Sequence, residues 1–496
     1  MPDRPTPRRR LRALTAGAFL LVLAPLAWPA SRPAVTAEPA ATRPFAWNRD
    51  SLWQELEASF AQRRTEGCTT GQATRTAMAS FDSTLVRLRT YRVAATDPVL
   101  DSLEHAFFEV GTEVAACGSL GNEYVALQGR LREAVKWQST AWDLTSRDVR
   151  DRLYRVLYGS RAAVEEVLLQ QDGISALYIG SDVPSATPSA ISNGVRLHSG
   201  DILVSRGGYP TSALIARGND YPGNFSHIAI VHVDSATSVI SVVEAHIERG
   251  VVIATADEYI ADRKLRIMLL RPRPDLPALQ RDPMLPHLAA TAMLDRARRE
   301  HIPYDFAMDY GDPSRMFCSE VASAAYRDQG VTLWTGISTI SAPGLRRWLA
   351  SFGVQSFETQ EPSDLEYDPQ LGVVAEWRDA ASLYDDHIDN AVTDAMLEGA
   401  ERGDELSFDW YTLPVARLVK GYSWMRQQLG GIGPIPEGMS PSAALSSRAY
   451  TARHAALKSA VRSAAAQWQA LQGYRPAYWT LVALARDGVV PARPAR

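Results

Sequence analysis

The spacing of apolar positions divides the chain into a helical part, a strand-rich part and a second helical part. From Asn48 to about Gln171, apolar residues recur every three or four positions, as Trp53, Leu56 and Phe60 do, which is typical of one helix face. We expect a helical bundle over residues 38–171. The breaks expected between its helices lie at Gly67–Gly71, Asp97–Pro98 and Cys117–Gly118, with a long helix from about Tyr124.

From about residue 195 the apolar pattern changes to that of strands, after a linker at 172–194 that is rich in Ser, Gly and Pro. The runs predicted as strands are Asp201–Ser205, Phe225–Val233, Val239–Ile247, Val251–Thr255 and Leu265–Leu270. The turn residues at 234–238 predict a hairpin between the second and third strands. Helical patterns at about 288–300, after Cys318 and at 344–352 complete an α+β domain over 195–356, an antiparallel sheet with helices.

An acidic connector at 357–373 precedes a C-terminal helical region at 374–496, which Gly430–Pro441 interrupts. Tyr384, Trp410 and Tyr411 are predicted to lie in the core of this region. Four neighbouring residues are of types that bind metals, but their spacing better fits a solvated helix face: Asp385, Asp386, His387 and Asp389.

The first 37 residues have the order of an export signal. Basic residues at Arg8–Arg12 precede the apolar run Ala13–Trp28, and Val35–Ala37 offers a small-x-small cleavage site, with Ala30 as an alternative. The run is shorter than the roughly 20 residues that span a bilayer. We therefore expect a cleaved signal and a location in the periplasm or cell envelope; an uncleaved membrane anchor is the alternative.

Composition and charge exclude some functions. The 46% apolar and 22% charged residues are typical of a globular protein. The net charge is −4, and without residues 1–37, which carry six Arg and one Asp, it is about −9. No basic surface for nucleic acid is expected.

The chain has three cysteines. Cys68 and Cys117 lie in loops at the same end of an up-down bundle, so we predict a disulfide between them, with two separate buried thiols as the alternative. Cys318 would then be a free thiol in an exported protein, which calls for a functional explanation.

Cys318 lies where an extended run turns into an apolar-periodic segment, so it is expected at a helix N-terminus, where the helix dipole favours a thiolate. His227 begins a predicted strand, and Glu244 lies on the next one. If the two strands pair across the turn at 234–238, the numbers of paired residues sum to 471 or 472. A sum of 471 places Glu244 opposite His227 and on the same face, whereas a sum of 472 places Ala245 there and Glu244 on the other face. A nucleophile, a base and an orienting carboxylate are thus candidates for one site.

Five motifs together resemble the circularly permuted branch of the NlpC/P60 papain-like superfamily, the YiiX/YebB-like cysteine hydrolases. The motifs are Gly200–Arg206, Phe225–Val231, Val243–Ala245, Pro303–Phe306 and Phe317–Glu320. The resemblance covers about 195–355 and has the permuted order, with the histidine before the cysteine. It implies a papain-like fold with Cys318 as nucleophile, His227 as base and Glu244 as the polar third member.

Four further residues are candidates for substrate binding. Tyr304 and Asp305 come shortly before Cys318 and would line the pocket, and Ser319 follows the nucleophile. Arg206 could hold a substrate carboxylate, and a place on the surface is its alternative.

The expected function is an exported cysteine hydrolase that cleaves amide bonds through a thioester, with peptide amides of the cell envelope as substrate and no cofactor or metal. One alternative is a lipid-directed amidase or acyltransferase. Another is a non-catalytic envelope binding protein whose helical regions dock on a partner or a membrane surface.

Overall fold

The structure is a computed structural model that describes residues 44–45, 51–67, 71–116 and 119–488. The expected signal peptide and the expected disulfide between Cys68 and Cys117 lie outside these residues. Of the helices within the described ranges, none has the length and apolar character needed to cross a membrane.

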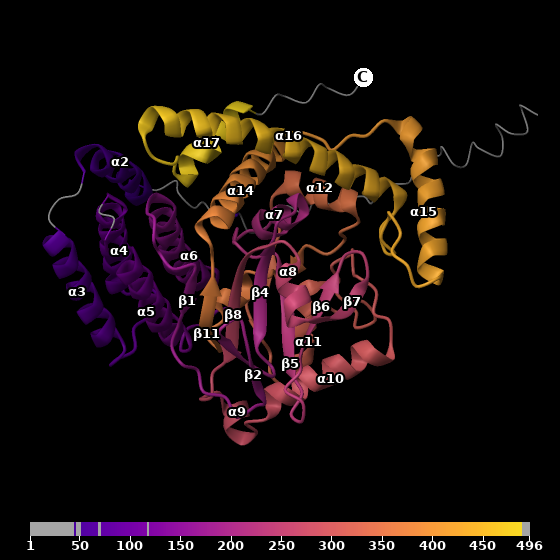
Figure 1. The fold of residues 1–496 in the computed structure, drawn as a ribbon, viewed down its shortest axis with the longest axis horizontal. Helices are drawn as coiled ribbons and strands as arrows, with labels where there is room; N and C mark the ends of the chain where they lie inside the picture. Colours follow the sequence, from indigo (N-terminus) through magenta and orange to yellow (C-terminus); the bar gives the residue numbers. More distant parts are fainter. Residues whose placement is uncertain (1–43, 46–50, 68–70, 117–118, 489–496) are drawn as a thin grey trace, which may run out of the picture.

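The N-terminal part is a layer of helices at one side of the molecule (Figure 1). They are α2 (Ser51–Glu66), α3 (Gly71–Leu88), α4 (Pro98–Ala116), α5 (Gly121–Ser139) and α6 (Arg147–Gln170). The long helix expected from Tyr124 is divided into α5 and α6. The division occurs because the Asp143 carboxylate accepts hydrogen bonds from the backbone and hydroxyl of Thr145, which closes a turn.

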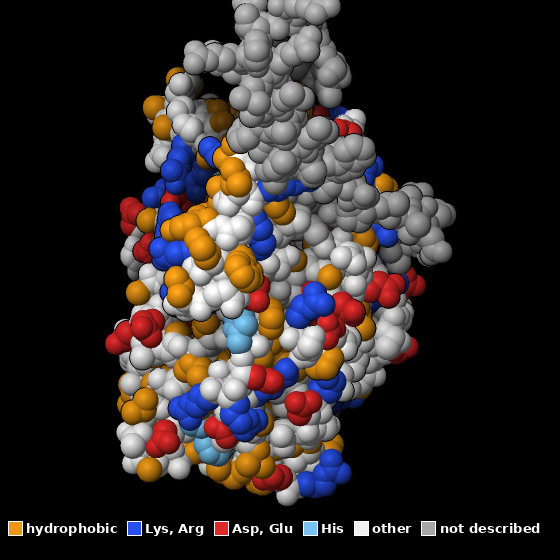
Figure 2. Space-filling view, turned by 90° about the vertical axis from the view of Figure 1, so that its right-hand side faces the viewer, with side chains coloured by type: hydrophobic (Ala, Val, Ile, Leu, Met, Phe, Trp, Pro, Cys, Tyr) orange, Lys and Arg blue, Asp and Glu red, His pale blue; other side chains and the backbone are white. Residues whose placement is uncertain are grey.

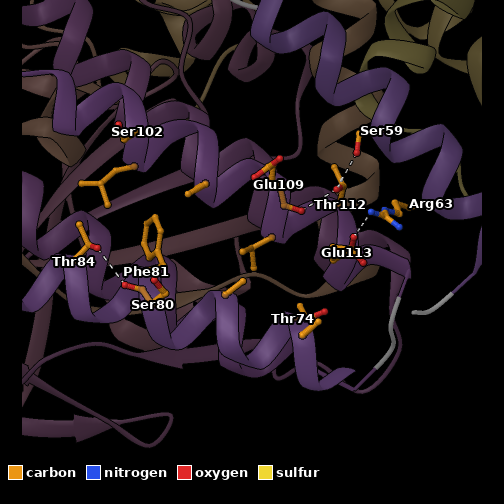
Figure 3. A pocket seen from close by; sticks show the side chains of 15 residues that line it. Ser59, Arg63, Thr74, Ser80, Phe81, Thr84, Ser102, Glu109, Thr112 and Glu113 are labelled. Atoms are coloured by element: carbon orange, nitrogen blue, oxygen red, sulfur yellow. Dashed lines mark hydrogen bonds and ion pairs between the residues drawn. The ribbon is translucent and has the colours of Figure 1, made fainter. Parts of the chain in front are cut away.

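Helices α2, α3 and α4 border a cavity of about 540 Å³ (Figure 3). Its lining mixes apolar side chains with an ion pair between Arg63 and Glu113, whose charged atoms are 2.7 Å apart. None of the candidate catalytic residues lines this cavity.

In the described part of the chain, seven strands form one antiparallel sheet. Their order is β1 (Leu177–Ile179), β11 (Leu371–Trp377), β8 (Lys264–Pro272), β4 (Ile202–Gly207), β5 (His227–Val233), β6 (Ile240–His246) and β7 (Gly250–Thr255). The predicted α+β class, with an antiparallel sheet between helical regions, is confirmed. The five strands predicted from alternation correspond to β4 to β8.

The sheet extends beyond the expected domain of 195–356. The expected linker at 172–194 carries β1 and also β2 (Ser189–Ser192), which forms a hairpin with β3 (Val195–His198). The expected connector carries the short β10 (Glu358–Thr359), which pairs with β9 (Ser338–Thr339), then α13 (Asp364–Tyr367) and the start of β11. Edge strands this short carry too few alternating residues to be read from sequence.

The two faces of the sheet have different cores. On one face, Ile228 and Ile230 of β5 pack in the main core with Val321 of α11 (Cys318–Arg327) and with α10 (Leu285–Arg299). On the other face, the alternate residues Ala229 and Val231 pack in a smaller core that includes Tyr259 of α8 (Ala256–Ala261). This side of the sheet is also covered by the β2–β3 hairpin through Leu197.

The C-terminal helices form a layer across one end of the sheet (Figure 1). They are α14 (Ala380–Glu401), α16 (Pro441–Gln472) and α17 (Tyr478–Gly488). These helices share a core with α7 (Pro210–Arg217) and α12 (Pro343–Phe352). The short helix α9 (Pro277–Arg281) lies at the other end of the molecule. Helix α15 (Leu413–Gln428) stands at the side, after a 3-10 turn at Trp410–Thr412. The prediction of a core position for Trp410 and Tyr411 is wrong, because their side chains are 72% and 62% exposed.

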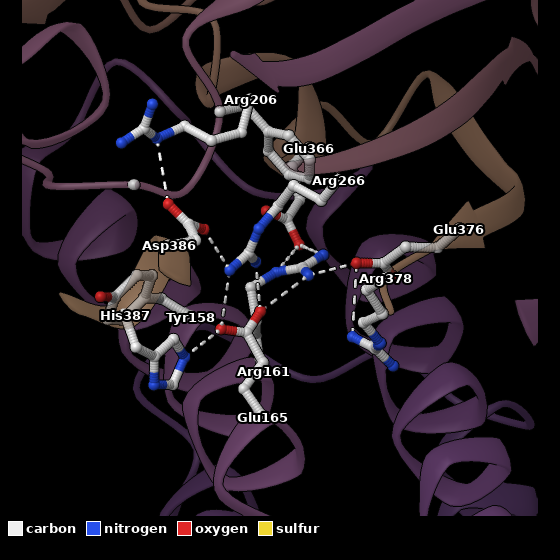
Figure 4. A network of polar contacts seen from close by, with 12 residues as sticks. Tyr158, Arg161, Glu165, Arg206, Arg266, Glu366, Glu376, Arg378, Asp386 and His387 are labelled. Atoms are coloured by element: carbon white, nitrogen blue, oxygen red, sulfur yellow. Dashed lines mark hydrogen bonds and ion pairs between the residues drawn. The ribbon is translucent and has the colours of Figure 1, made fainter. Parts of the chain in front are cut away.

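A buried network of charged side chains joins the three parts of the chain (Figure 4). Arg161 of α6 pairs with Glu366 of α13 and Glu376 of β11. Arg266 of β8 pairs with Glu165 of α6 and, at 2.5 Å, with Asp386 of α14.

This network corrects two expectations. Arg206 is fully buried, with its Nε 3.1 Å from Asp386, so it has no exposed guanidinium with which to hold a substrate carboxylate. Asp386, His387 and Asp389 are buried rather than solvated, and only Asp385 of that group is substantially exposed. Helix α14 crosses the end of the sheet, so the face that carries Asp386 meets the arginines of β4 and β8.

Candidate active site

Cys318 is the first residue of α11, which confirms its predicted place at a helix N-terminus. Phe317 is extended, with φ −92° and ψ 173°, and its N–H donates to the Glu320 carboxylate at 3.0 Å. This bond is half of a capping box and fixes where the helix starts. The preceding residue, Met316, forms a parallel bridge with Tyr304, so the loop before α11 is held beside that residue.

His227 and Glu244 meet on one face of the sheet, in a register that differs from both expected ones. The His227 Nε2 lies 2.6 Å from the Glu244 Oε2. Glu244 pairs with Ala229, so the paired residue numbers sum to 473, and neither expected register occurs. Glu244 is on the same face as His227 and reaches it diagonally. Because Nε2 then carries the proton, Nδ1 is left as the acceptor, the tautomer that a general base requires.

His246, which was not among the candidates from sequence, completes this group. Its Nε2 lies 3.0 Å from the Glu244 Oε1, and its ring is 6.0 Å from that of His227. Its place two positions after Glu244, on the same strand face, was the available signal. Ligand atoms of His227, Glu244 and His246 lie within 4.8 Å of one another, and zinc accepts imidazole and carboxylate ligands. A metal ion bound to the Nε2 of His227 would take the place of the proton that Nε2 donates in its hydrogen bond to Glu244.

Cys318 reaches the start of β5 from the helix-covered side of the sheet. Its thiol donates to the Ser226 carbonyl at 3.6 Å, directly before His227. Within the described residues, no hydrogen bond joins the Cys318 thiol to the His227 ring. The structure therefore brings the nucleophile to the residue next to the base, with the thiol turned toward the backbone.

Burial sets the protonation of both groups. It raises the pKa of the Cys318 thiol to about 12, and Glu361 adds to that rise. Burial also lowers the pKa of His227, although Glu244 opposes it. The pair is therefore a neutral thiol and a neutral imidazole at pH 7. This differs from the thiolate expected from the helix dipole, because desolvation of a buried thiolate outweighs one helix terminus.

The contact between Glu244 and His246 shifts the pKa of each toward its charged form. Burial alone would raise the pKa of Glu244, but hydrogen bonds from His227 and His246 outweigh it and lower the pKa below its usual value. Burial would lower the pKa of His246, but Glu244 raises it overall. Near neutral pH, Glu244 is thus an anion that orients the uncharged base.

Alkylation of Cys318 in the free protein is expected to be slow at neutral pH and to accelerate only well above the ordinary thiol pKa of about 8.5. Glu361→Gln should lower the apparent pKa only in part, because burial is the larger cause. The measurement is the labelling rate with iodoacetamide from about pH 6 to about pH 10, read at Cys318 by peptide mass. The same peptide in denatured protein is the control, and rapid labelling of folded protein below neutrality would contradict the neutral pair.

The other predicted site residues have unequal roles. Tyr304 is half-buried, burial and then Cys318 raise its pKa, and it forms a bridge with Met316, two residues before Cys318. Asp305 is buried and accepts hydrogen bonds from the N–H groups of Ala307 and Asp309, so its carboxylate holds a turn. Ser319 is buried as the second residue of α11.

An apolar cavity of about 310 Å³ lies on the sheet face that carries His227. Tyr259 forms part of its wall; the Tyr259 ring is 6.4 Å from the His227 ring, and its hydroxyl donates to Ser205 at 2.8 Å. Lys264 lies over the same tyrosine ring at 4.5 Å. Neither residue was a sequence candidate, because nothing in their spacing links them to the histidine.

The chain also matches one family of known proteins over part of its length. Residues 196–375 match the model of a family described as permuted papain-like amidase enzymes, YaeF/YiiX, C92 family. A solved structure titled metalloprotein yiiX from Escherichia coli O157:H7 covers 36% of this chain and 98% of its own, with 18% identity and a TM-score of 0.29. No curated protein matches the chain. The predicted resemblance to the YiiX-like permuted papain-like family is confirmed, and the match supports an amide-bond hydrolase of the cysteine type.

Proposed function

We propose that this protein is an exported cysteine amidase in which Cys318, His227 and Glu244 cleave amide bonds of cell-envelope peptides. The observation that carries the proposal is the 2.6 Å bond between His227 and Glu244, which leaves Nδ1 of a neutral imidazole free beside the strand start that Cys318 contacts. The family match supports the reaction class. The expected signal sequence supports the envelope location.

The chemistry begins when the thiol leaves the Ser226 carbonyl and turns toward His227. Nδ1 of His227 takes the thiol proton while sulfur attacks the amide carbonyl, and backbone N–H groups at the start of α11 stabilise the oxyanion. The carbon–nitrogen bond then breaks, and the same proton leaves with the amine. Water, deprotonated by His227, hydrolyses the thioester and restores the thiol.

A lipid amide is the second candidate substrate, because the apolar cavity bounded by Tyr259 lies beside the base. A long acyl chain could occupy such a space, whereas a polar peptide would leave it empty.

An acyl-enzyme on Cys318 is the expected intermediate for either substrate. Full-length protein should be mixed with short peptide amides or with N-acyl amides of long-chain acids, quenched in acid and mapped by mass spectrometry. The expected result is an adduct on the peptide that contains Cys318, which neutral hydroxylamine releases as a thioester. Cys318→Ser is the control, because an oxygen ester resists that reagent.

The identity of the adduct distinguishes the substrates. A peptidyl adduct alone supports the envelope amidase, and a long-chain acyl adduct alone supports the lipid amidase. Amine release without a hydroxylamine-sensitive adduct would overturn the thioester mechanism. Absence of both product and adduct would favour the non-catalytic binding protein.

A further inference from the structure

Helix α15 presents its larger apolar residues to solvent instead of to the protein. The side chains of Val415, Leu418, Tyr422, Met425 and Leu429, here called the α15 stripe, are between 47% and 84% exposed. Their spacing of three and four residues places them along one side of the helix. The buried side carries Leu413, Ala416 and Ser423. A partner that covers the stripe would therefore remove a continuous apolar surface from water.

The segment that carries the stripe is rich in cationic and aromatic residues. No Asp or Glu occurs between Asp409 and Glu437, whereas Arg417, Lys420 and Arg426 do, although the whole chain has a net charge of −4. Trp410 and Trp424, outside the stripe, are 72% and 60% exposed. Figure 2 faces this side of the molecule and shows apolar side chains gathered at the level of α15 with Lys and Arg beside them.

These features favour an anionic bilayer over a second copy of the chain. Two copies paired through their α15 stripes would bring Arg417 and Arg426 toward like charges, with no acid on the helix to compensate. An anionic lipid surface attracts those cations. Tryptophan and tyrosine side chains are the residues that membrane interfaces prefer, and an apolar stripe lies in the headgroup boundary without crossing the membrane.

The segment that follows α15 connects the stripe to the candidate active site. The Lys420 Nζ donates to the Glu437 carbonyl at 2.6 Å, which holds the returning loop against the helix. A Cβ atom on Gly438 would lie 2.7 Å from the Phe306 ring, so the loop packs directly on Phe306. That ring is 5.1 Å from the ring of Tyr304, which forms a bridge with Met316, two residues before Cys318.

We propose that α15 is an interfacial helix that binds the surface of an anionic lipid bilayer through the α15 stripe and brings the loop carrying Tyr304 to that surface. The proposal concerns membrane binding and does not depend on amide hydrolysis. It assigns a role to the C-terminal helical region, which lies outside the segment matched by the amidase family.

The test is flotation of the full-length protein with vesicles of phosphatidylcholine containing phosphatidylglycerol, and with vesicles of phosphatidylcholine alone. The variant combines Leu418→Asp, Met425→Asp and Leu429→Asp. We expect its binding to anionic vesicles to be weaker by about tenfold or more, because three apolar contacts are lost and three negative charges approach the lipid. Wild-type binding should also weaken on neutral vesicles and in high salt.

A matched variant makes the same change of charge elsewhere. Val86, Val239 and Leu471 are 61%, 56% and 83% exposed and lie away from α15, so their replacement by Asp should leave vesicle binding within about twofold. Unfolding temperatures of both triple variants, compared with the wild type, establish that each is folded. Equal binding of the two variants would overturn the proposal, as would wild-type protein that does not bind vesicles. A dimer of the wild type that the α15 variant loses, without vesicle binding, would assign the stripe to a second copy instead.

Discussion

The Cys318→Ala variant is expected to fold like the wild type and to lose about 10³-fold or more of its amidase activity. The loss is large because no other side chain of the site can form the covalent intermediate. The fold should persist because the substitution removes one small buried side chain, whose thiol donates a hydrogen bond to the Ser226 carbonyl. The measurement is kcat/KM on the amide identified by acyl-enzyme mapping, with the unfolding temperature measured alongside.

Histidine variants provide the matched comparison for that result. His227→Ala should reduce activity to a similar degree, because the base and the nucleophile act as a unit. His287, whose Nδ1 lies 2.8 Å from the Ser199 hydroxyl and outside the site, is the control, and His287→Ala should remain active. In the wild type, kcat/KM should decrease at acid pH with a midpoint below about pH 6.5, the ordinary pKa of histidine, because burial lowers the pKa of His227. Full activity of Cys318→Ala would refute the mechanism.

The Arg161→Met variant is expected to lose about 3–5 kcal/mol of unfolding free energy, the largest effect on stability among the changes considered. Arg161 is fully buried and pairs with Glu366 and Glu376, which are equally buried. Removing it leaves two carboxylates without their main cation in a medium that solvates them poorly. Urea unfolding at neutral pH measures the loss.

The pH dependence of this loss tests its electrostatic origin. Burial would raise the pKa of Glu376, but Arg161, Arg378 and Arg132 outweigh it and lower the pKa below the usual value. The stabilisation is thus present above the unfolded pKa, about 4.5, and is lost as the pH falls through the folded pKa. The difference in unfolding free energy between the wild type and Arg161→Met should therefore shrink as the pH falls below about 4.5.

Two controls accompany the Arg161 variant. Arg130→Met breaks an exposed pair with Asp82 and should change stability by about 1 kcal/mol or less. A double variant with Glu376→Gln should recover part of the loss, since one unpaired charge is removed. A deficit that stays constant with pH would assign the loss to packing alone.

The sequence predicted those parts of the fold that local pattern determines. Runs of five to nine residues with strand patterning identified β4 to β8, and the turn at 234–238 identified the hairpin that carries His227 and Glu244. The pairing of β1 with β11 joins residues about 200 positions apart, and no local pattern specifies that contact. The expected linker and connector therefore became part of the sheet.

In the site, the residue types were predictable and their environment was not. The sequence left open whether Glu244 faces His227, because the two expected registers, 471 and 472, place it on opposite faces. The observed sum of 473 differs from 471 by two, so it puts both residues on one face, as 471 would have done. The protonation state of Cys318 depends on how deeply α11 is buried and on Glu361, more than forty residues later. Arg206 and Asp386 looked like surface residues because each is charged; their burial depends on each other across 180 residues.

The charge network also constrains the order in which the chain can fold. Helix α6 is synthesised long before its partners: Arg161 bonds Glu366 at a separation of 205 residues, His387 bonds Glu165 at 222, and Tyr478 bonds Glu166 at 312. Closing such long loops costs conformational entropy, which the contacts offset only after they have formed. Contacts between residues far apart in the sequence therefore slow folding. A growing chain must keep the Arg161 charge without its main partners until Glu366 and Glu376 arrive, 205 and 215 residues later. The sheet is thus completed only when β11 arrives, and a fragment ending before β11 would leave Arg161 without Glu376.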